Sequence, residues 1–380
     1  MRFGPVLMLP ALLAVSCGGV PANASHSVSP SASPSAATAA SPSSAPLAVP
    51  LRGSYGLLLS AGTLQLVSPD ATVAASVTVA PASAQFCSYQ NDTLVAPPPV
   101  SASSDEVYFR DGDTRIRMIA SSSGAEDVTT VPGGPTTISF FSVSPDDQRI
   151  AVLVEEVSNA TAVNERLYVE DLRGGGNHVD IFKTDVPKDV RGTTLWPMGW
   201  HQGQLVMAVM AACTSQPVDL SPSAWKVVDA TSFAQKVDIV ASSCILSVWP
   251  SPAGVVCVNL TQPNATAYDW TDKALGAVTT DPLNRQSGLD PSGQSVFLSS
   301  AASAASASQG TGIHGRFRLG NTEYGLVAGH SACLWIDSSH LLAPDSVIRT
   351  GVDPSDGLTF GQVTLLSANG QCAGRFPGGL

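Results

Sequence analysis

Short apolar runs separated by polar turns are the dominant pattern along this chain. The clearest example is the stretch 142–154, SVSPDDQRIAVLV, in which a polar turn directly precedes an apolar run. After a polar excursion comes RLYVEDLRGGG, a second apolar segment with a glycine-rich end. Apolar and β-branched runs bounded by Gly, Pro, Asp and Ser predict β-strands joined by tight turns. This part of the chain is therefore expected to form the order turn, strand, loop, strand, turn.

The same turn-and-strand unit recurs along the chain. Its turns are centred near residues 53, 104, 146, 202, 253, 292 and 338, so successive turns are roughly 40 to 55 residues apart. Such a period, with four short strands in each unit, is typical of a β-propeller. One such sheet cannot cover both of its faces, whereas sheets stacked around an axis cover each other. We expect an all-β propeller over residues 51–380 with about seven four-stranded blades. A count of six or eight blades is the alternative.

A propeller ring must be closed by joining its first and last units. We expect this closure to pair a strand near residues 45–51 with strands of the last unit. The small-residue run 299–312, SSAASAASASQGTG, predicts a flexible loop in the sixth unit.

The opening stretch also carries a family resemblance. SPDDQRIAVLV followed by RLYVEDLRGGG resembles the WD40-like repeat in the propeller of TolB-type periplasmic proteins. In that family a Ser-Pro-Asp-Gly turn precedes the strand, and a Tyr-Val-x-Asp-Leu-x-Gly-Gly strand and turn follow. Asp147 stands where the family has Gly, whereas the fitting positions are Tyr168, Val169, Asp171, Leu172, Gly174 and Gly175. The units near 290 and 335 match in part. The resemblance implies the fold only, because propellers host many unrelated functions.

The N-terminal residues MRFGPVLMLPALLAVSCGG are typical of a secretion signal. Arg2 precedes an apolar stretch over residues 6–15, which is too short to span a membrane. LAVSC at 13–17 resembles the bacterial lipobox, which implies a signal peptide over residues 1–16 and acylation of Cys17. Leu lies one place earlier than in the commonest form of this motif. Ordinary signal cleavage, with Cys17 incidental, is the alternative.

Residues 17–50 are predicted to be a disordered tether. Residues 18–50 contain no Asp, Glu, Lys or Arg and are rich in Ser, Ala and Pro, so they cannot bury a core. No other segment has about twenty consecutive apolar residues, and we therefore expect no transmembrane helix. The expected location is the extracytoplasmic face of the cell membrane, with attachment through the lipid anchor alone.

Composition and charge narrow the classes of partner. Only 13% of the 380 residues are charged, and the formal net charge is −11. An acidic surface argues against a nucleic-acid groove and against electrostatic docking on anionic lipid. The abundance of Gly (33) and Pro (28) suits many short strands and turns.

The cysteines predict disulfides. Without Cys17, six remain in an exported chain, which indicates up to three bridges among fifteen possible connectivities. Cys244 and Cys257 flank the turn 249–254 almost symmetrically and are expected to be cross-strand neighbours. Metal ligation is the rival use, but no Cys-x-x-Cys spacing is present. The disulfide candidates are Cys87, Cys213, Cys244, Cys257, Cys333 and Cys372.

No residues in the sequence form a recognisable catalytic, cofactor or metal site, and we expect none. The six histidines lack zinc-site spacing: His26, His178, His201, His314, His330 and His340. GHSAC at 329–333 lacks the last Gly of a nucleophile elbow, and the glycines at 174–176 lack the Lys and helix of a phosphate loop. A weakly bound ion at 111–113 or 146–147 stays open, although neither is an EF-hand loop. The six tryptophans are expected to pack in the core or between blades.

These patterns predict a surface-tethered β-propeller lipoprotein that acts as a non-catalytic binding or scaffold module in the bacterial cell envelope. Its partner would be an envelope protein or an extracellular ligand. The alternatives are an enzyme, an enzyme-gating propeller of the envelope hydrolase type, or an extracytoplasmic solute sensor. His, Asp, Glu and Arg side chains that converge at the mouth of the central channel would favour an enzyme, whereas a lining of Ser, Thr and Ala would favour a scaffold.

Overall fold

The structure is a computed structural model that describes residues 51–84, 93–94, 96–157, 162–187, 192–214, 221–279, 286–300, 313–319, 322–327, 332–343, 346–349, 360–362 and 371–380. Residues 1–50, with the expected signal peptide, Cys17 and the tether, lie outside these ranges, as do Cys87 and most of the expected loop 299–312. In the described part, no helix is long and apolar enough to cross a membrane.

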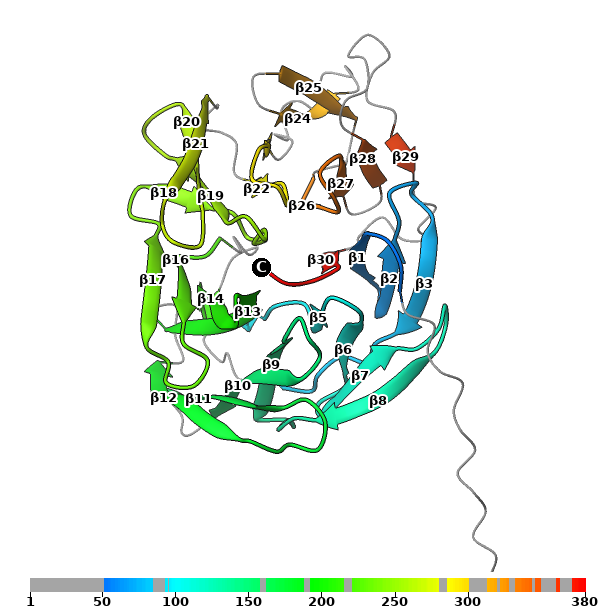
Figure 1. The fold of residues 1–380 in the computed structure, drawn as a ribbon, viewed down its shortest axis with the longest axis vertical. Coiled ribbons are helices and arrows are strands. Elements are labelled where there is room, and N and C mark those ends of the chain that lie inside the picture. The colour runs from blue at the N-terminus through cyan, green and yellow to red at the C-terminus, as the bar shows by residue number, and fades with distance from the viewer. Residues whose placement is uncertain are drawn as a thin grey trace, which may run out of the picture. The chain divides into compact units, whose positions relative to one another are not determined.

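The described residues form seven four-stranded antiparallel sheets and one two-stranded ribbon. The sheets surround a central axis as a β-propeller; the innermost strand is the first of its sheet along the chain in sheets 2 to 7 and is β30 in sheet 1 (Figure 1). The all-β propeller expected from the sequence is therefore confirmed. We number the sheets 1 to 7 along the chain.

The strands are given from the innermost outward. Sheet 1 contains β30 (Gln371–Phe376), β1 (Tyr55–Ser60), β2 (Thr63–Val67) and β3 (Val73–Thr78). Sheet 2 contains β5 (Val100–Ala102), β6 (Val107–Asp111), β7 (Arg115–Ile119) and β8 (Ala125–Thr130). Sheet 3 contains β9 (Thr137–Val143), β10 (Arg149–Val157), β11 (Ala162–Asp171) and β12 (Val179–Pro187). Sheet 4 contains β13 (Thr193–His201), β14 (Gln204–Ala211), β16 (Ala224–Val228) and β17 (Gln235–Val240).

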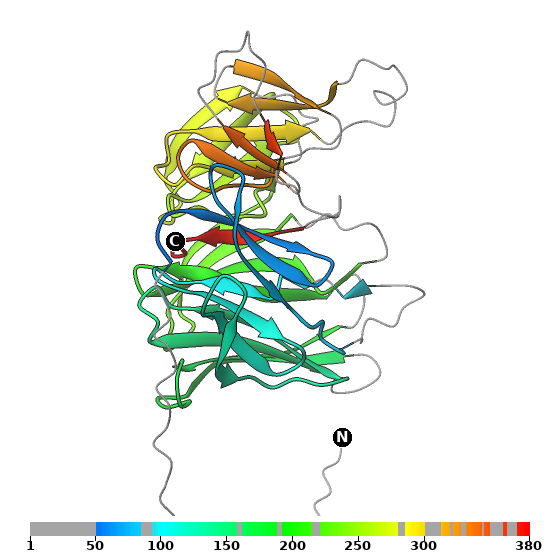
Figure 2. The same ribbon diagram turned by 90° about the vertical axis from the view of Figure 1, so that its right-hand side faces the viewer.

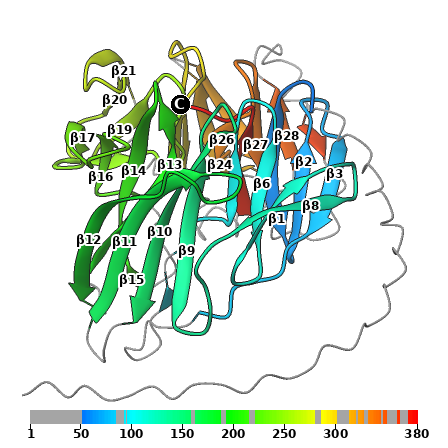
Figure 3. The same ribbon diagram turned by 60° about the horizontal axis from the view of Figure 1, so that its bottom comes forward.

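Sheet 5 contains β18 (Cys244–Leu246), β19 (Val255–Asn259), β20 (Asn264–Tyr268) and β21 (Ala274–Thr279). Sheet 6 contains β22 (Gln286–Leu289), β23 (Val296–Ser300), β24 (Ile313–Leu319) and β25 (Thr322–Val327). Sheet 7 contains β26 (Leu334–Trp335), β27 (His340–Ala343), β28 (Ser346–Arg349) and β29 (Phe360–Gln362). The ribbon pairs β15 (Cys213–Thr214) with β4 (Thr93–Leu94), and Figure 3 shows β15 at the end of the propeller away from residue 380.

The second strands read as continuous apolar runs because both of their faces are buried. On β10, Val152 and Val154 pack in a cluster shared with sheet 2, whereas Ala151 and Leu153 pack in a cluster shared with sheet 4. On β1, Leu57 likewise faces sheet 2. Successive side chains of a strand point to opposite faces, so each run serves two sheet–sheet interfaces. The core is therefore a series of apolar layers between neighbouring sheets.

The repeated polar turn connects the first strand of a sheet to the second. In sheet 3 the Ser144 hydroxyl donates to Asp146 at 2.6 Å and accepts the amide of Arg149 at 2.9 Å. Asp147 has a φ of 57°, the left-handed conformation for which the repeat family uses Gly. Its carboxylate accepts a hydrogen bond from Tyr108 of sheet 2 at 2.7 Å. Asp147 therefore adds a link between sheets 2 and 3.

The ring closes in the opposite sense to the one expected. Residues 45–50 of the expected closing strand lie outside the described residues, and Leu51 belongs to no strand. The closure that the structure shows is made by β30, which pairs antiparallel with β1 and is the innermost strand of sheet 1 (Figure 2). The first unit supplies only three strands of its own, and its open inner edge is covered by the C-terminal strand. A disulfide between Cys333 and Cys372 then ties β30 to the start of sheet 7. The two ends of the ring are thus joined both by hydrogen bonds and covalently.

Candidate functional site

A cavity of about 90 Å³ lies on the axis of the propeller, where the innermost strands meet. All seven sheets contribute to its lining. The contributing strands are β1, β30, β5, β9, β13, β22 and β26, together with the turn 249–251 of sheet 5. Its position follows from the topology, because the innermost strand of every sheet runs beside the axis. We call this space the channel cavity.

Two segments of the chain lie at opposite ends of the channel cavity. At the end that carries the inter-strand turns, Gly378 donates its amide to the carbonyl of Ser103 at 2.7 Å, and Leu380 donates to the carbonyl of Trp200 at 2.8 Å. A Cβ atom on Gly378 would lie 1.9 Å from the carbonyl oxygen of Ala102, so this close approach requires Gly. At the other end, Pro97 and its neighbour Pro98 precede β5 and complete the lining. The segment 376–380 therefore bridges sheets 2 and 4 across the mouth.

The lining is mainly apolar or small, with one charged side chain. Among the described lining residues, Arg375 is the only one with a charged side chain. Two of the lining serines are already engaged: Ser101 accepts the amide of Val143 at 2.9 Å, and Ser251 donates to the carbonyl of Asp290 at 2.9 Å. Trp249 and other lining residues at the mouth are only partly buried, so solvent reaches the cavity.

Arg375 lies on the innermost strand of sheet 1 and has no ion-pair partner among the described residues. It is the cross-strand partner of Gly56, and a Cβ on Gly56 would touch the side chain of Leu342 in sheet 7. Cross-strand partners share one face of a sheet, so the Arg375 side chain lies on the face of sheet 1 that is turned to sheet 7. Burial lowers the pKa of Arg375 to about 10, and no carboxylate opposes this shift. Within the described residues, its guanidinium makes no hydrogen bond or ion pair.

Several tryptophans form hydrogen bonds between neighbouring sheets, in agreement with the predicted packing of tryptophans between blades. The indole Nε1 of Trp200 in sheet 4 donates to the carbonyl of Ser142 in sheet 3 at 3.2 Å. The same contact joins Trp225 of sheet 4 to the turn of sheet 5, and Trp335 of sheet 7 to sheet 6, each at 3.1 Å. Their rings lie in the core, and their N–H groups satisfy carbonyls of the next sheet.

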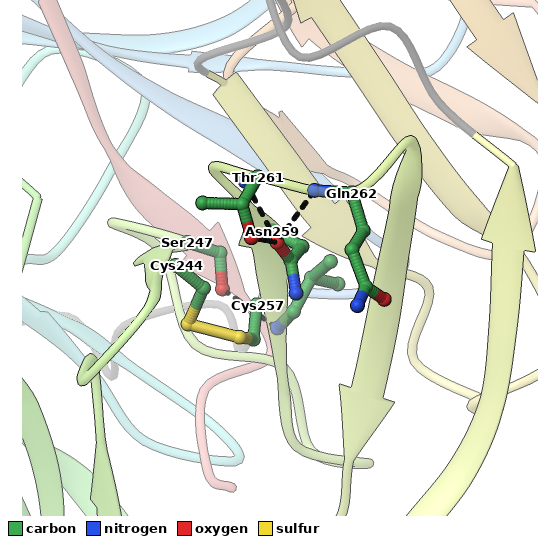
Figure 4. Close-up of a disulfide and its surroundings, with 7 residues drawn as sticks. Cys244, Ser247, Cys257, Asn259, Thr261 and Gln262 are labelled. Atoms are coloured by element: carbon green, nitrogen blue, oxygen red, sulfur yellow. Dashed lines mark hydrogen bonds between the residues drawn. A yellow bond between two sulfur atoms is a disulfide. The ribbon is translucent and has the colours of Figure 1, made fainter.

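The described cysteines form disulfides. Cys244 and Cys257, the pair expected from their spacing, are joined across the hairpin of β18 and β19, with their Cα atoms 5.4 Å apart (Figure 4). Cys333 is bonded to Cys372, and Cys213 is also disulfide-bonded. In Figure 4, the Ser247 hydroxyl accepts the amide of Val256, so polar contacts support the same hairpin.

The histidines do not converge. The Nδ1 of His178 lies 2.7 Å from Glu170, which raises the pKa of this histidine, and its ring packs on Tyr168 at the outer edge of sheet 3. His340 contacts Asp337 in the turn of sheet 7 at 2.9 Å. His201 ends β13, and His314 lies on β24, whereas His26 and His330 lie outside the described residues. In the ranges that the structure describes, no group of three or more His, Cys, Asp or Glu could hold a metal ion.

The other candidate motifs have structural roles. Asp111 forms ion pairs with Arg115 at 2.7 Å and Arg117 at 3.3 Å, and Asp113 accepts the amide of Ser83 at 2.6 Å. The glycines at 174–176 form the turn between β11 and β12. Of the segment 329–333, only the last two residues belong to the described part.

Two buried carboxyl groups form a site that was not singled out from the sequence. Glu155 on β10 and Glu165 on β11 are cross-strand partners, and each is only 1% exposed. Thr194 of sheet 4 donates its hydroxyl to Glu155, while one oxygen of each carboxyl has no partner among the described residues. Burial raises the pKa of Glu155 to about 8 and that of Glu165 to about 7, and the nearby Glu165 adds to the shift of Glu155. Both carboxyls therefore keep their protons to a higher pH in the folded protein than an exposed Glu does. They lie in the core between sheets 3 and 4, away from the channel cavity.

Comparisons with known proteins give only a general likeness. No protein-family model matches the chain, and no curated protein does. A protein of unknown function from Bacteroides caccae is 9% identical, with 72% of this chain and 90% of that chain covered and a TM-score of 0.39. The dihydro-heme d1 dehydrogenase NirN in complex with DHE is 14% identical, with coverages of 77% and 67% and a TM-score of 0.37. A europium-containing methanol dehydrogenase is 9% identical, with coverages of 86% and 80% and a TM-score of 0.42. Likenesses at this level assign no ligand or reaction to this chain.

Proposed function

We propose that this chain is a seven-bladed propeller of the WD40-like, TolB-type kind, tethered to the extracytoplasmic face of the cell membrane through Cys17, and that it acts as a non-catalytic binding module of the cell envelope. The seven four-stranded sheets support the blade count. The lipobox-like motif and the uncharged segment 18–50 support the tether. A lipid anchor followed by such a tether would hold the propeller away from the bilayer surface.

The composition of the channel cavity is the observation that carries the binding role. Its described lining is mainly apolar or small, and its three serines are Ser101, Ser142 and Ser251. Charged groups that converge on the mouth would instead be expected for acid–base chemistry. A rigid ring that presents loops at its ends is a suitable surface for recognition. We place the partner-binding surface at the turn end of the channel, around Trp249 and Pro250.

Site-specific photo-cross-linking in the envelope tests this proposal. A photoreactive amino acid in place of Pro250 at the mouth should give a discrete cross-linked species in cells that express the full chain. The matched control carries it in place of Leu275, which is 44% exposed on the outermost strand β21. Cross-linking at position 275 alone, or equally at both positions, would contradict a partner-binding mouth. Turnover of a substrate by the purified propeller would favour the enzyme alternative.

A further inference from the structure

We propose that the channel cavity binds a small organic monocarboxylate through Arg375. This inference rests on the proposed binding role and names a chemical class of ligand for the same site. A guanidinium carries five N–H donors. Those of Arg375 have no hydrogen-bond acceptor within the described residues. The Arg375 side chain is partly buried, so its charge is partly desolvated, and an anion that enters the cavity would offset that cost.

The geometry favours a carboxylate that carries one negative charge. The planar guanidinium fork matches a carboxylate or phosphate with paired hydrogen bonds. Because Arg375 is the only charged side chain in the described lining, it can balance one negative charge on a ligand, and a second negative charge would have no cationic side chain to balance it. A dianionic phosphate is therefore disfavoured relative to a monocarboxylate.

The surrounding walls indicate that the rest of the ligand is apolar. Trp249, Pro250, Pro98 and Leu334 line the same cavity as Arg375. These side chains offer apolar contact to a hydrocarbon or aromatic body. The cavity volume of about 90 Å³ is below the several hundred Å³ that is common for drug-sized ligands. The expected ligand is thus a compact acid, with its carboxylate on Arg375 and its apolar part against Trp249.

Binding can be measured by titrating the full chain with propionate and with benzoate, followed by calorimetry and by the fluorescence of Trp249 and Trp335. We expect saturable binding that is tighter for benzoate, because benzoate covers more of the apolar wall. Arg375→Gln should weaken benzoate binding by about tenfold or more, since it removes a charge-assisted pair of hydrogen bonds. Arg52→Gln removes the same charge at an exposed position and should leave the affinity unchanged.

Further variants and probes keep the test decisive. Arg375→Lys keeps the charge but loses the planar fork, and an intermediate affinity is expected even if Arg375→Gln folds poorly. No saturable binding of either acid would overturn the proposal, as would equal benzoate affinity in Arg375→Gln. Inorganic phosphate that binds as tightly as benzoate would also overturn it. None of these failures affects the cross-linking at position 250, so the binding of a macromolecular partner is tested separately.

Discussion

Replacement of Glu155 by Gln should make the stability of the protein less dependent on pH. The carboxyl of Glu155 is buried between sheets 3 and 4, and its pKa is raised from the usual 4.5 to about 8. In the unfolded chain the same group ionises above about pH 4.5. Stability is therefore fully present below that pH and decreases as the pH rises towards 8, because only the unfolded state releases the proton. The decrease ends above the folded-state pKa.

The size of the effect follows from the shift. One pKa unit corresponds to about 1.4 kcal/mol, so the lost stability at pH 7 is about 3 kcal/mol. An uncharged amide of nearly the same shape does not titrate, and it can still accept the hydrogen bond from Thr194. The difference in unfolding free energy between Glu155→Gln and the parent should therefore widen by about 3 kcal/mol between pH 5 and pH 7.5, in favour of the variant.

Urea unfolding of both proteins at pH 5, 6, 7 and 7.5 measures this difference. Glu156→Gln is the matched control, because Glu156 is the next residue on β10 and is exposed. The control should run parallel to the parent at every pH. If the stability difference between Glu155→Gln and the parent stays constant over this range, or changes in the opposite direction, the raised pKa of the buried Glu155 carboxyl is refuted.

Three further predictions concern the ring and its tether. Replacing Cys333 and Cys372 by Ala should lower the free energy of unfolding by about 4 kcal/mol, because this disulfide closes a loop of 39 residues. Replacing Cys244 and Cys257 should lower it by about 3 kcal/mol, because their loop has only 13 residues. Urea unfolding that finds the larger loss for the second pair would contradict this estimate. Deletion of residues 371–380 removes β30 from sheet 1, so the remainder should aggregate or lose cooperative unfolding, and a stable soluble product would contradict the ring closure. Cys17→Ala should release the protein from the membrane or leave its signal uncut, whereas partition into the detergent phase as for the parent would exclude lipidation.

The sequence predicted the repeating unit because the physical cause of the repeat is local. A polar turn such as 144–148 must satisfy its own backbone amides, and the strand after it must present apolar side chains on both faces. Both requirements are visible within a window of about a dozen residues. The turns between the first and second strands of sheets 2 to 7 accordingly lie at or next to the turn centres predicted from the sequence.

Ring closure could not be read in the same way because it depends on a pairing between the two ends of the propeller. The segment QCAGRF of β30 contains Gly and Arg and lacks the apolar run of the other strands. One signal was available, since the turn near residue 53 directly follows the Ser-, Ala- and Pro-rich segment 18–50, whose composition does not favour a strand. An unfilled inner position of this kind indicates that a distant strand must complete the sheet.

The buried acid Glu155 and the channel residue Arg375 differ in how far the sequence alone could have identified them. Glu155 follows Ala151 and Leu153 at a spacing of two, so the alternation of β10 places it on a buried face. That parity could have identified it as a buried acid. Arg375 stands alone in a glycine-rich segment, and only the topology brings it to the axis.

Disulfide mapping of the mature protein is the most direct test of the ring as described. Proteolysis without reduction, followed by mass spectrometry, should recover one peptide pair that links Cys333 to Cys372 and another that links Cys244 to Cys257. The first linkage requires β30 of sheet 1 to lie beside the start of sheet 7, which is also the arrangement that places Arg375 at the channel cavity. Recovery of Cys372 as a free thiol, or bonded to any cysteine other than Cys333, would contradict this closure of the propeller.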